Sequence, residues 1–420
     1  MIFIALQCLV GPRWTGITGD SYEYARISLQ ILGKPHAQAE QEAWKWWCAS
    51  KASEEARTAR VDPIRFREPS PQTASYRRCA QQYAAYAATT PTQRTRYQAI
   101  FNGRPGYPAL ASPAIAAFGV GGGLWVTDVF ITAAAALLTG LLLHAAGSGT
   151  LGMLLGQGVY LLSPLGVWSM RPLADGTLNA TVIAVLLATW CLLGRRHVVL
   201  ASGALAAGLT AACAVKYSSG LLLGLCLISV VVLCWIFVPN TRHAGTVILA
   251  ALASTAAAAT LSLMRLLGLP GTRDTLQDTF TRHFHRPDVA NPWTLLAELN
   301  VHYWWEWLQQ QAALPLFLVL TGVAGWALLR WAPVLGYLAV AAAAMGVLTV
   351  VSHPLGTDGD RLGVLIWTPV VFGLPFAITR LPGLRTKPST GTACPSYQKS
   401  VMVSTKQQAS DATAEPQQAP

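Results

Sequence analysis

The sequence predicts an all-α, polytopic membrane helix bundle of about ten transmembrane helices with a helical exported first loop. Hydrophobic residues make up 53% of the 420-residue chain and charged residues 12%, and that charged fraction is about half that of an average soluble domain. The apolar residues occur in runs of roughly 20, the length that crosses a hydrocarbon core about 30 Å thick. None of these runs alternates as barrel strands do, so we expect helices, whose backbone groups bond within the segment.

Nine full-length transmembrane helices are expected, at 124–146, 150–170, 176–194, 198–215, 219–238, 244–268, 312–329, 332–352 and 362–379. Residues 1–10 are also apolar, but as a helix they rise only about 15 Å, half of a span. They lack the positive charge and cleavage site of a signal peptide. Two interpretations are open: an interfacial segment, or the second half of a helix that begins upstream of Met1. We favour the second, which completes the ten helices.

Charges in the short loops predict the orientation. Counted alternately along the chain, one set of loops carries only basic charges: Arg195, Arg196, Arg242, Arg330, Arg380, Arg385 and Lys387. The opposite set carries both signs: Arg171, Lys216, Arg361, Asp175, Asp358 and Asp360. Because excess Lys and Arg marks the cytoplasmic side, both termini of this integral plasma-membrane protein are expected in the cytoplasm. Residues 1–380 then form the transmembrane domain, and 381–420, rich in Ser, Thr, Gln, Ala and Pro, form a disordered cytoplasmic tail.

Two long loops, 13–123 and 269–311, are expected to be exported. The first is strongly basic, which the orientation rule permits because long loops translocate largely regardless of charge. The chain has a net charge of +11. We therefore expect it to interact with anionic lipid headgroups or a phosphate-bearing substrate rather than with nucleic acid. Residues 109–121 are apolar but contain Pro113 and Gly119, and we expect a short interfacial helix there.

The first exported loop is expected to contain helices at 21–32, 38–60 and 73–88. The first shows Tyr24, Ile27 and Ile31 at helical spacing and ends at Gly33. Cys48 and Cys79 are the cysteines of this loop, and an oxidising compartment favours a disulfide between them over two free thiols.

Two aspartates at the exported face have two interpretations each. Asp20 is either the N-cap of the helix at 21–32, with Glu23 at position N3, or a catalytic carboxylate held at the membrane surface by a helix lying on the lipid. Asp175 is either the N-cap of the span that begins at 176, or a residue that positions an acceptor or binds a metal together with Asp20.

Several exported-face motifs resemble, in order and spacing, those of the GT-C superfamily of polyprenyl-phosphate-sugar-dependent membrane glycosyltransferases, which includes protein O-mannosyltransferases and aminoarabinose transferases. They are Gly19 to Gly33 with Asp20, Arg104-Pro-Gly-Tyr-Pro108, Met170 to Asp175, the Gly-rich helix from Gly203 to Lys216, and Asp360-Arg361 with Pro369. The chain departs from the family in lacking an Asp-Glu pair at the first motif and a large C-terminal exported domain.

The resemblance implies transfer of a sugar from a polyprenyl-phosphate donor to an envelope glycan, lipid or protein acceptor. It implies that Asp20 is the catalytic base and that Asp175 assists it. Lys216, Arg361 and Arg171 would bind the donor phosphate and stabilise its developing charge, or else anchor lipid headgroups. Cofactor use stays open between none and a divalent metal. The alternatives are a transporter or flippase for a lipid-linked or envelope precursor, and a non-catalytic membrane relative.

Overall fold

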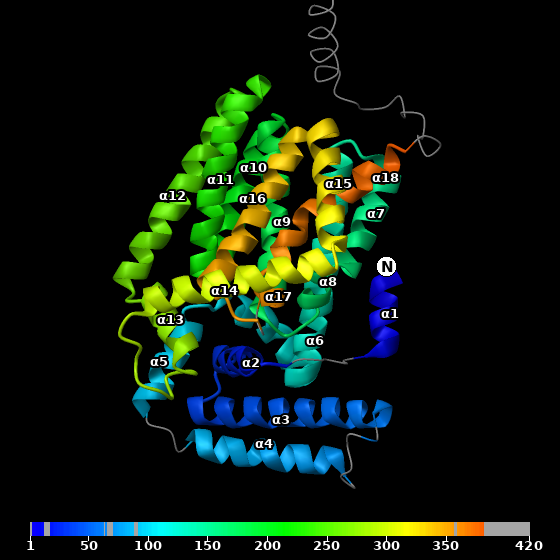
Figure 1. Cartoon of the computed structure of the whole chain (residues 1–420). Coiled ribbons are helices and arrows are strands. Elements are labelled where there is room, and N and C mark those ends of the chain that lie inside the picture. Colours follow the sequence, from blue (N-terminus) through cyan, green and yellow to red (C-terminus); the bar gives the residue numbers. More distant parts are fainter. Residues whose placement is uncertain are drawn as a thin grey trace, which may run out of the picture. The chain divides into compact units, whose positions relative to one another are not determined.

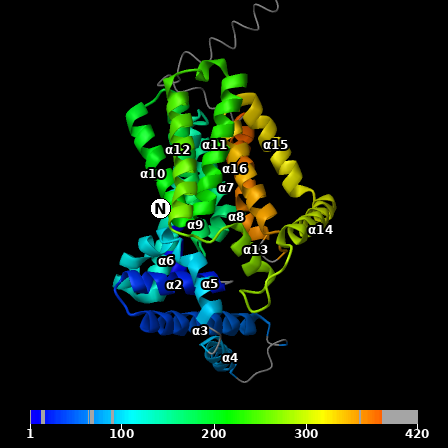
Figure 2. The same cartoon turned by 90° about the vertical axis from the view of Figure 1, so that its left-hand side faces the viewer.

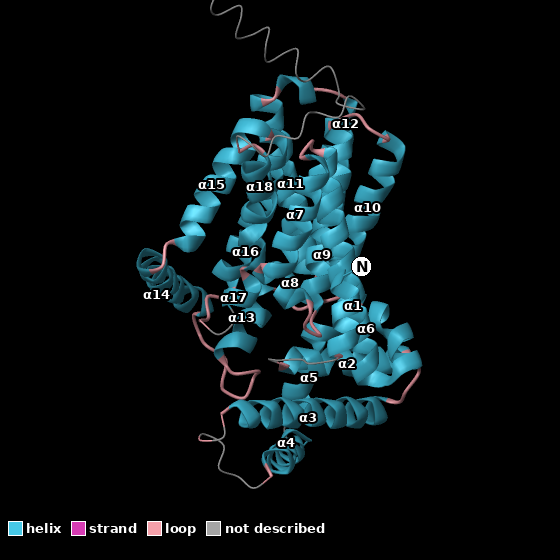
Figure 3. Cartoon of the chain, turned by 90° about the vertical axis from the view of Figure 1, so that its right-hand side faces the viewer, coloured by secondary structure: helices cyan, strands magenta, loops and turns pink. Residues whose placement is uncertain are grey.

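The computed structural model describes residues 2–11, 17–62, 64, 70–87, 91–356 and 359–381. All regular structure in these ranges is helical, with no strand (Figure 3). The chain divides into a compact unit, Met1–Ile378, and a second unit, Thr379–Pro420. The predicted tail beyond Leu381 lies outside the described residues, as do the loop charges of Asp358, Arg385 and Lys387.

Six helices of the described chain are long and apolar enough to cross a membrane: α6 (Gly106–Ala145), α9 (Ala174–Leu193), α10 (Val198–Val215), α11 (Tyr217–Phe237), α12 (Ala244–Leu266) and α16 (Pro333–Ser352). A seventh candidate is the pair α14 (Pro292–Ala313) and α15 (Leu316–Trp331), whose axes are bent by 86°. The protein is therefore an all-α bundle with several apolar helices suited to a multi-pass membrane protein. The expected count of about ten is not confirmed.

Fewer long apolar helices are found than expected because turns interrupt some of the apolar runs. Residues 150–170 form two helices, α7 (Gly149–Leu162) and α8 (Pro164–Ser169), because Pro164 cannot donate a backbone hydrogen bond to continue the first helix. Residues 362–379 form the end of α17 (Gly359–Leu362), the 3-10 turn η2 (Val364–Trp367) and α18 (Thr368–Thr379). At the N-terminus, α1 (Ile2–Val10) is a helix of 9 residues that contacts α6.

Successive long helices pack as neighbours joined by short turns. Helix α9 packs against α6 and α10, and α11 packs against α12 and α16 (Figure 1). Short connections make successive helices run antiparallel, so the junctions α8–α9, α10–α11 and α16–α17 lie at one end of the bundle. This arrangement gathers at one end the loops that contain Asp175, Lys216 and Arg361.

The first long loop folds into α2 (Gly19–Ile31), α3 (His36–Val61), α4 (Pro71–Ala87) and α5 (Pro91–Asn102), which lie across the same end of the bundle (Figure 2). A disulfide joins Cys48 of α3 to Cys79 of α4. Helix α2 contacts both α3 and α6, and every residue from Ser21 to Leu29 is buried. The interpretation of this helix as one that lies on lipid is therefore wrong, since protein covers the whole of its middle part.

A kink at Gly119 separates the start of α6 from its apolar span. Gly119 adopts φ 72° and ψ 174°, a conformation that glycine reaches without strain. The chain then turns back so closely that a Cβ on Gly123 would lie 2.3 Å from the backbone nitrogen of Ile115. The short helix expected at 109–121 is thus present as the first arm of α6.

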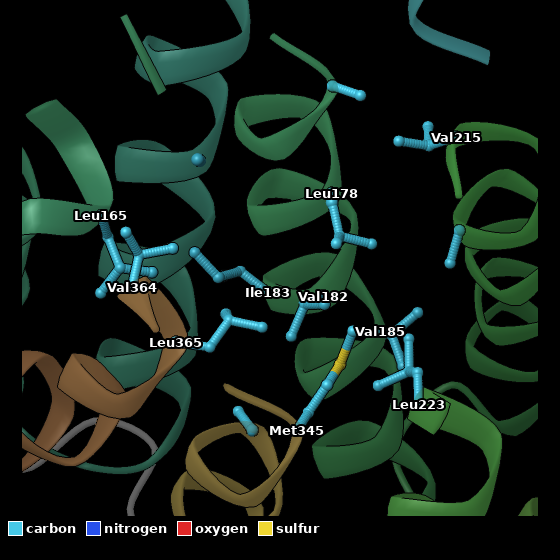
Figure 4. Packing of buried hydrophobic residues seen from close by; sticks show 14 of the residues in the cluster. Leu165, Leu178, Val182, Ile183, Val185, Val215, Leu223, Met345, Val364 and Leu365 are labelled. Carbon is cyan, nitrogen blue, oxygen red and sulfur yellow. The ribbon is translucent and has the colours of Figure 1, made fainter. Parts of the chain in front are cut away.

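The core between α8, α9, α16 and η2 is built from interlocking aliphatic side chains. Leu165, Val182, Met345 and Leu365 meet there (Figure 4), and all four are buried. Small residues bring the helices close, as at Gly346, where an added Cβ would lie 2.9 Å from the backbone nitrogen of Ile366. Such close approach is how membrane helices gain packing energy where lipid is as apolar as the side chains. This core fixes α17 and η2 against α8 and α16.

Candidate functional site

Arg361 joins two carboxylates at the end of the bundle. Its Nη2 donates to Asp20 Oδ2 at 2.5 Å, and its Nε donates to Asp175 Oδ2 at 2.9 Å. The Asp20, Arg361 and Asp175 side chains are 21%, 14% and 11% exposed. The structure therefore brings together three of the residues singled out in the sequence, in a cluster that solvent or a ligand can reach.

Both aspartates lie in the first turn of a helix, but neither is its N-cap. The N-cap of α2 is Thr18 and that of α9 is Leu173, so the capping interpretations of Asp20 and Asp175 are wrong. In the first turn each carboxylate benefits from the positive end of the helix dipole, while its side chain is turned to Arg361. The helices thus position the two carboxylates, and the carboxylate oxygens that bond to Arg361 are not used for helix capping.

Glu23 also differs from its expected place at N3, which Ser21 occupies. Glu23 is fully buried and pairs with Arg26 at 2.8 Å on the next turn of α2. Burial raises the pKa of Glu23 to about 7, against the lowering effect of Arg26. Arg26 also donates to Asn102 of α5 at 3.1 Å, so this pair fixes α2 against the neighbouring helix α5 rather than capping it.

Lys216 and Arg104 complete the charge pattern around Asp20. Lys216 is the single residue between α10 and α11, and Arg104 lies just before α6. Burial alone would raise the pKa of Asp20, but the charges of Arg361, Arg104 and Lys216 lower it below its ordinary value. The pKa of Lys216 falls to about 8, chiefly through burial, while Asp175 opposes that shift. At neutral pH Asp20 is therefore ionised and Lys216 is mostly protonated.

The cluster holds an excess of positive charge. Arg361 is balanced by two carboxylates, whereas Arg104 and Lys216 add two further cations to the same field. The Nε of Arg104 is buried and has no hydrogen-bond partner among the described residues. A buried donor without a partner costs free energy, so an anionic group bound here would be stabilised by both cations.

Two neutral side chains adjoin the charged ones. Burial raises the pKa of Tyr24 of α2, with Arg104 opposing and Asp20 adding to that shift. Burial, followed by the charges of Lys216 and Arg104, lowers the pKa of His353 to about 4. Both groups are therefore uncharged at neutral pH. They are polar groups of the site that donate or accept hydrogen bonds without changing its charge.

Tyr24 is held in place by a contact with α6. Its ring packs edge-on against Tyr107 of α6, with ring centroids 5.4 Å apart. The Tyr107 hydroxyl donates to Asp128 Oδ1 at 2.8 Å. Asp128, an ionisable group inside a predicted span, thus has a partner that links it to the residue beside Asp20.

Arg171 is placed differently from the other predicted phosphate ligands. Its guanidinium lies over the Trp168 ring, 3.6 Å from the centroid. Burial lowers the pKa of Arg171, and Arg361 is among the charges that act on it. Arg171 therefore lies at the edge of the cluster, where cation–π contact with an indole occupies its guanidinium.

Sequence reasoning gave three residues of the cluster no role in it: Arg104, Tyr24 and His353. Arg104 and Tyr24 lie within the motifs that resemble the GT-C superfamily, and Arg104 precedes the first apolar helix on the same face as Asp20. Nothing near His353 in the sequence distinguishes it.

As for metals, the described residues contain no group of three or more His, Cys, Asp or Glu that could hold an ion. Comparison of the chain with protein-family models, characterised proteins and solved structures gave no match.

Proposed function

We propose that the chain is a membrane glycosyltransferase of the GT-C type. It would move a sugar from a polyprenyl-phosphate carrier to a cell-envelope acceptor on the extracytoplasmic face of the plasma membrane. The observation that carries the proposal is the cluster of Asp20, Asp175 and Arg361 with Lys216 and Arg104 beside it. In the proposed topology α1, α7–α8 and α17–α18 complete about ten crossings, both termini are cytoplasmic, and the cluster is outside.

The reaction would be a single displacement at the anomeric carbon. Asp20 takes the proton of the acceptor hydroxyl, whose oxygen forms the new bond to that carbon. The bond from the carbon to the phosphate oxygen breaks, and polyprenyl phosphate leaves with the electron pair. A carboxylate within reach of the hydroxyl supplies the base, and fixed cations stabilise the charge that grows on the phosphate.

The contacts suggest a division of roles among the cations. Arg361 is already paired with Asp20 and Asp175, so we assign it to positioning these carboxylates. Lys216 and Arg104 form no direct ion pair within the described residues, and we assign them to the donor phosphate. Asp175 then orients Arg361 and faces the acceptor side of the cluster.

Asp20→Asn tests the assignment of the base. Asparagine keeps the size of the side chain and can still accept a hydrogen bond from Arg361, but it cannot take a proton. We expect transfer from a radiolabelled polyprenyl-phosphate sugar to fall by about 100-fold or more, in membranes that lack the native protein. Glu306→Gln, an exposed carboxylate on α14, is the matched control and should retain activity. Asp20→Asn activity within threefold of wild type, roughly 0.7 kcal/mol in the barrier, would remove Asp20 as the base.

Binding of polyprenyl phosphate to the purified protein in nanodiscs separates the donor site from the chemistry. Lys216→Ala and Arg104→Ala should each weaken binding by about tenfold, since a charge-assisted hydrogen bond contributes about 1.5 kcal/mol or more. Asp20→Asn should bind at least as tightly as wild type, because it removes a like charge. Movement of the lipid across vesicles without sugar transfer would instead identify a transporter.

A further inference from the structure

Helix α14 runs across the end of the apolar helix that follows it. It has 22 residues, a length of about 33 Å, and its axis is bent by 86° from that of α15. Figure 3 shows the two helices meeting at this corner. If α14 crossed the bilayer, Glu298, His302 and Glu306 would lie in hydrocarbon, which is costly for ionisable groups. Its direction and composition therefore both argue against a transmembrane position.

One side of α14 is fixed to the protein. Asn300 Nδ2 donates to the carbonyl oxygen of Val351 at 2.9 Å, and Trp304 Nε1 donates to Asn300 Oδ1 at 3.2 Å. Tyr303 lies so close to Gly359 that a Cβ there would be 2.2 Å from the phenol oxygen. This side contacts the end of α16 and the start of α17, the turn that carries Arg361.

A second side of α14 is apolar and exposed. Trp293, Val301, Trp305 and Leu308 are 56%, 69%, 63% and 52% exposed. At about 100° per residue these positions fall within one third of the helix circumference. Large apolar side chains gathered on one exposed stripe need a partner that excludes water.

The exposed side chains of the remaining third are mainly polar, with half-buried Leu295 and Leu299 between them. The polar residues are two acidic and three uncharged ones: Glu298, His302, Glu306, Gln309 and Gln310. Helix α14 contains neither Lys nor Arg. Three stripes therefore follow one another around the helix, the first against protein, the second apolar and the third suited to water.

We propose that α14 lies flat in the bilayer interface, with the stripe of Trp293, Val301, Trp305 and Leu308 in the boundary between headgroups and acyl chains. Tryptophan favours this depth, because its ring is apolar and its N–H is polar. A helix with one apolar and one polar face binds there through buried apolar area. Because α14 lacks basic residues, its partner is the interface itself and not anionic headgroups.

This placement connects the bilayer to the charged cluster. The protein-facing stripe of α14 contacts Val351 and Gly359, and these are two residues from His353 and Arg361. An interfacial α14 therefore fixes the height of the α17 turn relative to the membrane surface. The inference needs only a membrane-embedded protein and holds whether or not the proposed sugar transfer is correct.

Single cysteines labelled with an environment-sensitive fluorophore test the proposal. The background replaces every cysteine outside the disulfide, and the protein is reconstituted into phosphatidylcholine vesicles. Val301→Cys and Leu308→Cys probe the apolar stripe, and His302→Cys and Gln309→Cys are their matched neighbours on the polar stripe. Lipids brominated high on the acyl chain should quench the first pair at least about twofold more than the second, and aqueous iodide should do the reverse.

Adding phosphatidylglycerol to the vesicles should leave this pattern unchanged, since α14 has no basic residue to attract anionic lipid. Equal quenching of both pairs by iodide would show an apolar stripe left in water, and would overturn the proposal. Equal quenching of both pairs by bromines at the chain ends would also overturn it, by showing a helix inside the bilayer. Protection of the apolar stripe from both quenchers, relieved by dilution with lipid, would identify a second copy of the chain as the partner instead.

Discussion

Arg361→Gln removes the side chain that holds the two carboxylates of the cluster together. It deletes the charge-assisted hydrogen bonds to Asp20 and Asp175, each of which contributes about 1.5–3 kcal/mol. Both carboxylates would then share a mostly buried site without this counter-charge. Because their side chains keep 21% and 11% exposure, water relieves part of the cost. We expect the free energy of unfolding to fall by about 3 kcal/mol, near the lower limit for a broken buried ion pair.

A double-mutant cycle in detergent micelles measures this coupling by denaturant unfolding followed by circular dichroism. Asp20→Asn alone should lower the free energy of unfolding by about 1–2 kcal/mol. The double variant should lose about 1 kcal/mol less than the sum of the losses of the two single variants. Arg330→Gln, an exposed arginine at the end of α15, is the control and should shift stability by less than about 0.5 kcal/mol. Strict additivity, or an Arg361→Gln variant as stable as wild type, would refute the reasoning.

The pH dependence of the same variant checks the sign of the interaction. In the wild type, burial would raise the pKa of Asp20, but Arg361 and its neighbours lower it. Ionised Asp20 therefore contributes stability above its unfolded pKa, and this contribution is lost as pH falls through the lowered folded value. In Arg361→Gln the burial effect is opposed less strongly, so the pKa of Asp20 rises and protonation at mildly acidic pH relieves the unpaired charge. The stability gap between the two proteins should narrow from pH 7 towards pH 5.

Two further predictions concern the disulfide of α3 and α4 and the orientation. Mass spectrometry of non-reduced peptides should recover a link between Cys48 and Cys79, and free alkylation of both without reductant would exclude it. In a background without other reactive cysteines, Gly356→Cys should react with an impermeant reagent added outside intact cells. His197→Cys should react only after permeabilisation, and the reverse pattern would invert the proposed topology.

The helices and the common face of the charged residues follow from local sequence. Long apolar runs mark α9, α10, α11, α12 and α16 to within about two residues, because each run ends where a charge or turn residue must leave the membrane. Because successive helices joined by short turns run antiparallel, successive loops alternate between the two ends of the bundle, and no knowledge of packing is needed to assign them. That is why Asp20, Asp175, Lys216 and Arg361 could be assigned to one face before the fold was known.

Hydropathy could not show where apolar sequence stops being helix. The predicted span at 150–170 breaks at Ser163 and Pro164, and the one at 362–379 begins with the last residue of α17 and the turn η2. Apolar composition is the same on both sides of these breaks. Whether the backbone continues as a helix or turns depends on the neighbouring helices. At η2, for example, the backbone of Ile366 approaches Gly346 of α16 closely because Gly346 has no side chain.

The pairing of charges was equally inaccessible, because the partners are far apart along the chain. Asp20 and Arg361 are separated by 341 positions, and an ion pair between such distant residues produces no periodic pattern in the sequence. The sequence assigned Asp20 to a helix cap or to catalysis, but not to an ion pair with Arg361. The proximity of Arg104 to Asp20 could not be predicted for a related reason, since it depends on how α2 packs against the start of α6.

The charge balance of the cluster implies an order of binding for the proposed reaction. In the free protein Asp20 is a weak base, because Arg361, Arg104 and Lys216 together hold its pKa below the ordinary value. An anionic phosphate on Lys216 and Arg104 would offset those two charges and raise the pKa of Asp20 towards the range in which a carboxylate accepts a proton efficiently. In the proposed reaction Asp20 would therefore become an effective base only after the donor has bound. An acceptor that reached the empty site would meet a carboxylate still paired with Arg361, so the proposed order of binding is donor first.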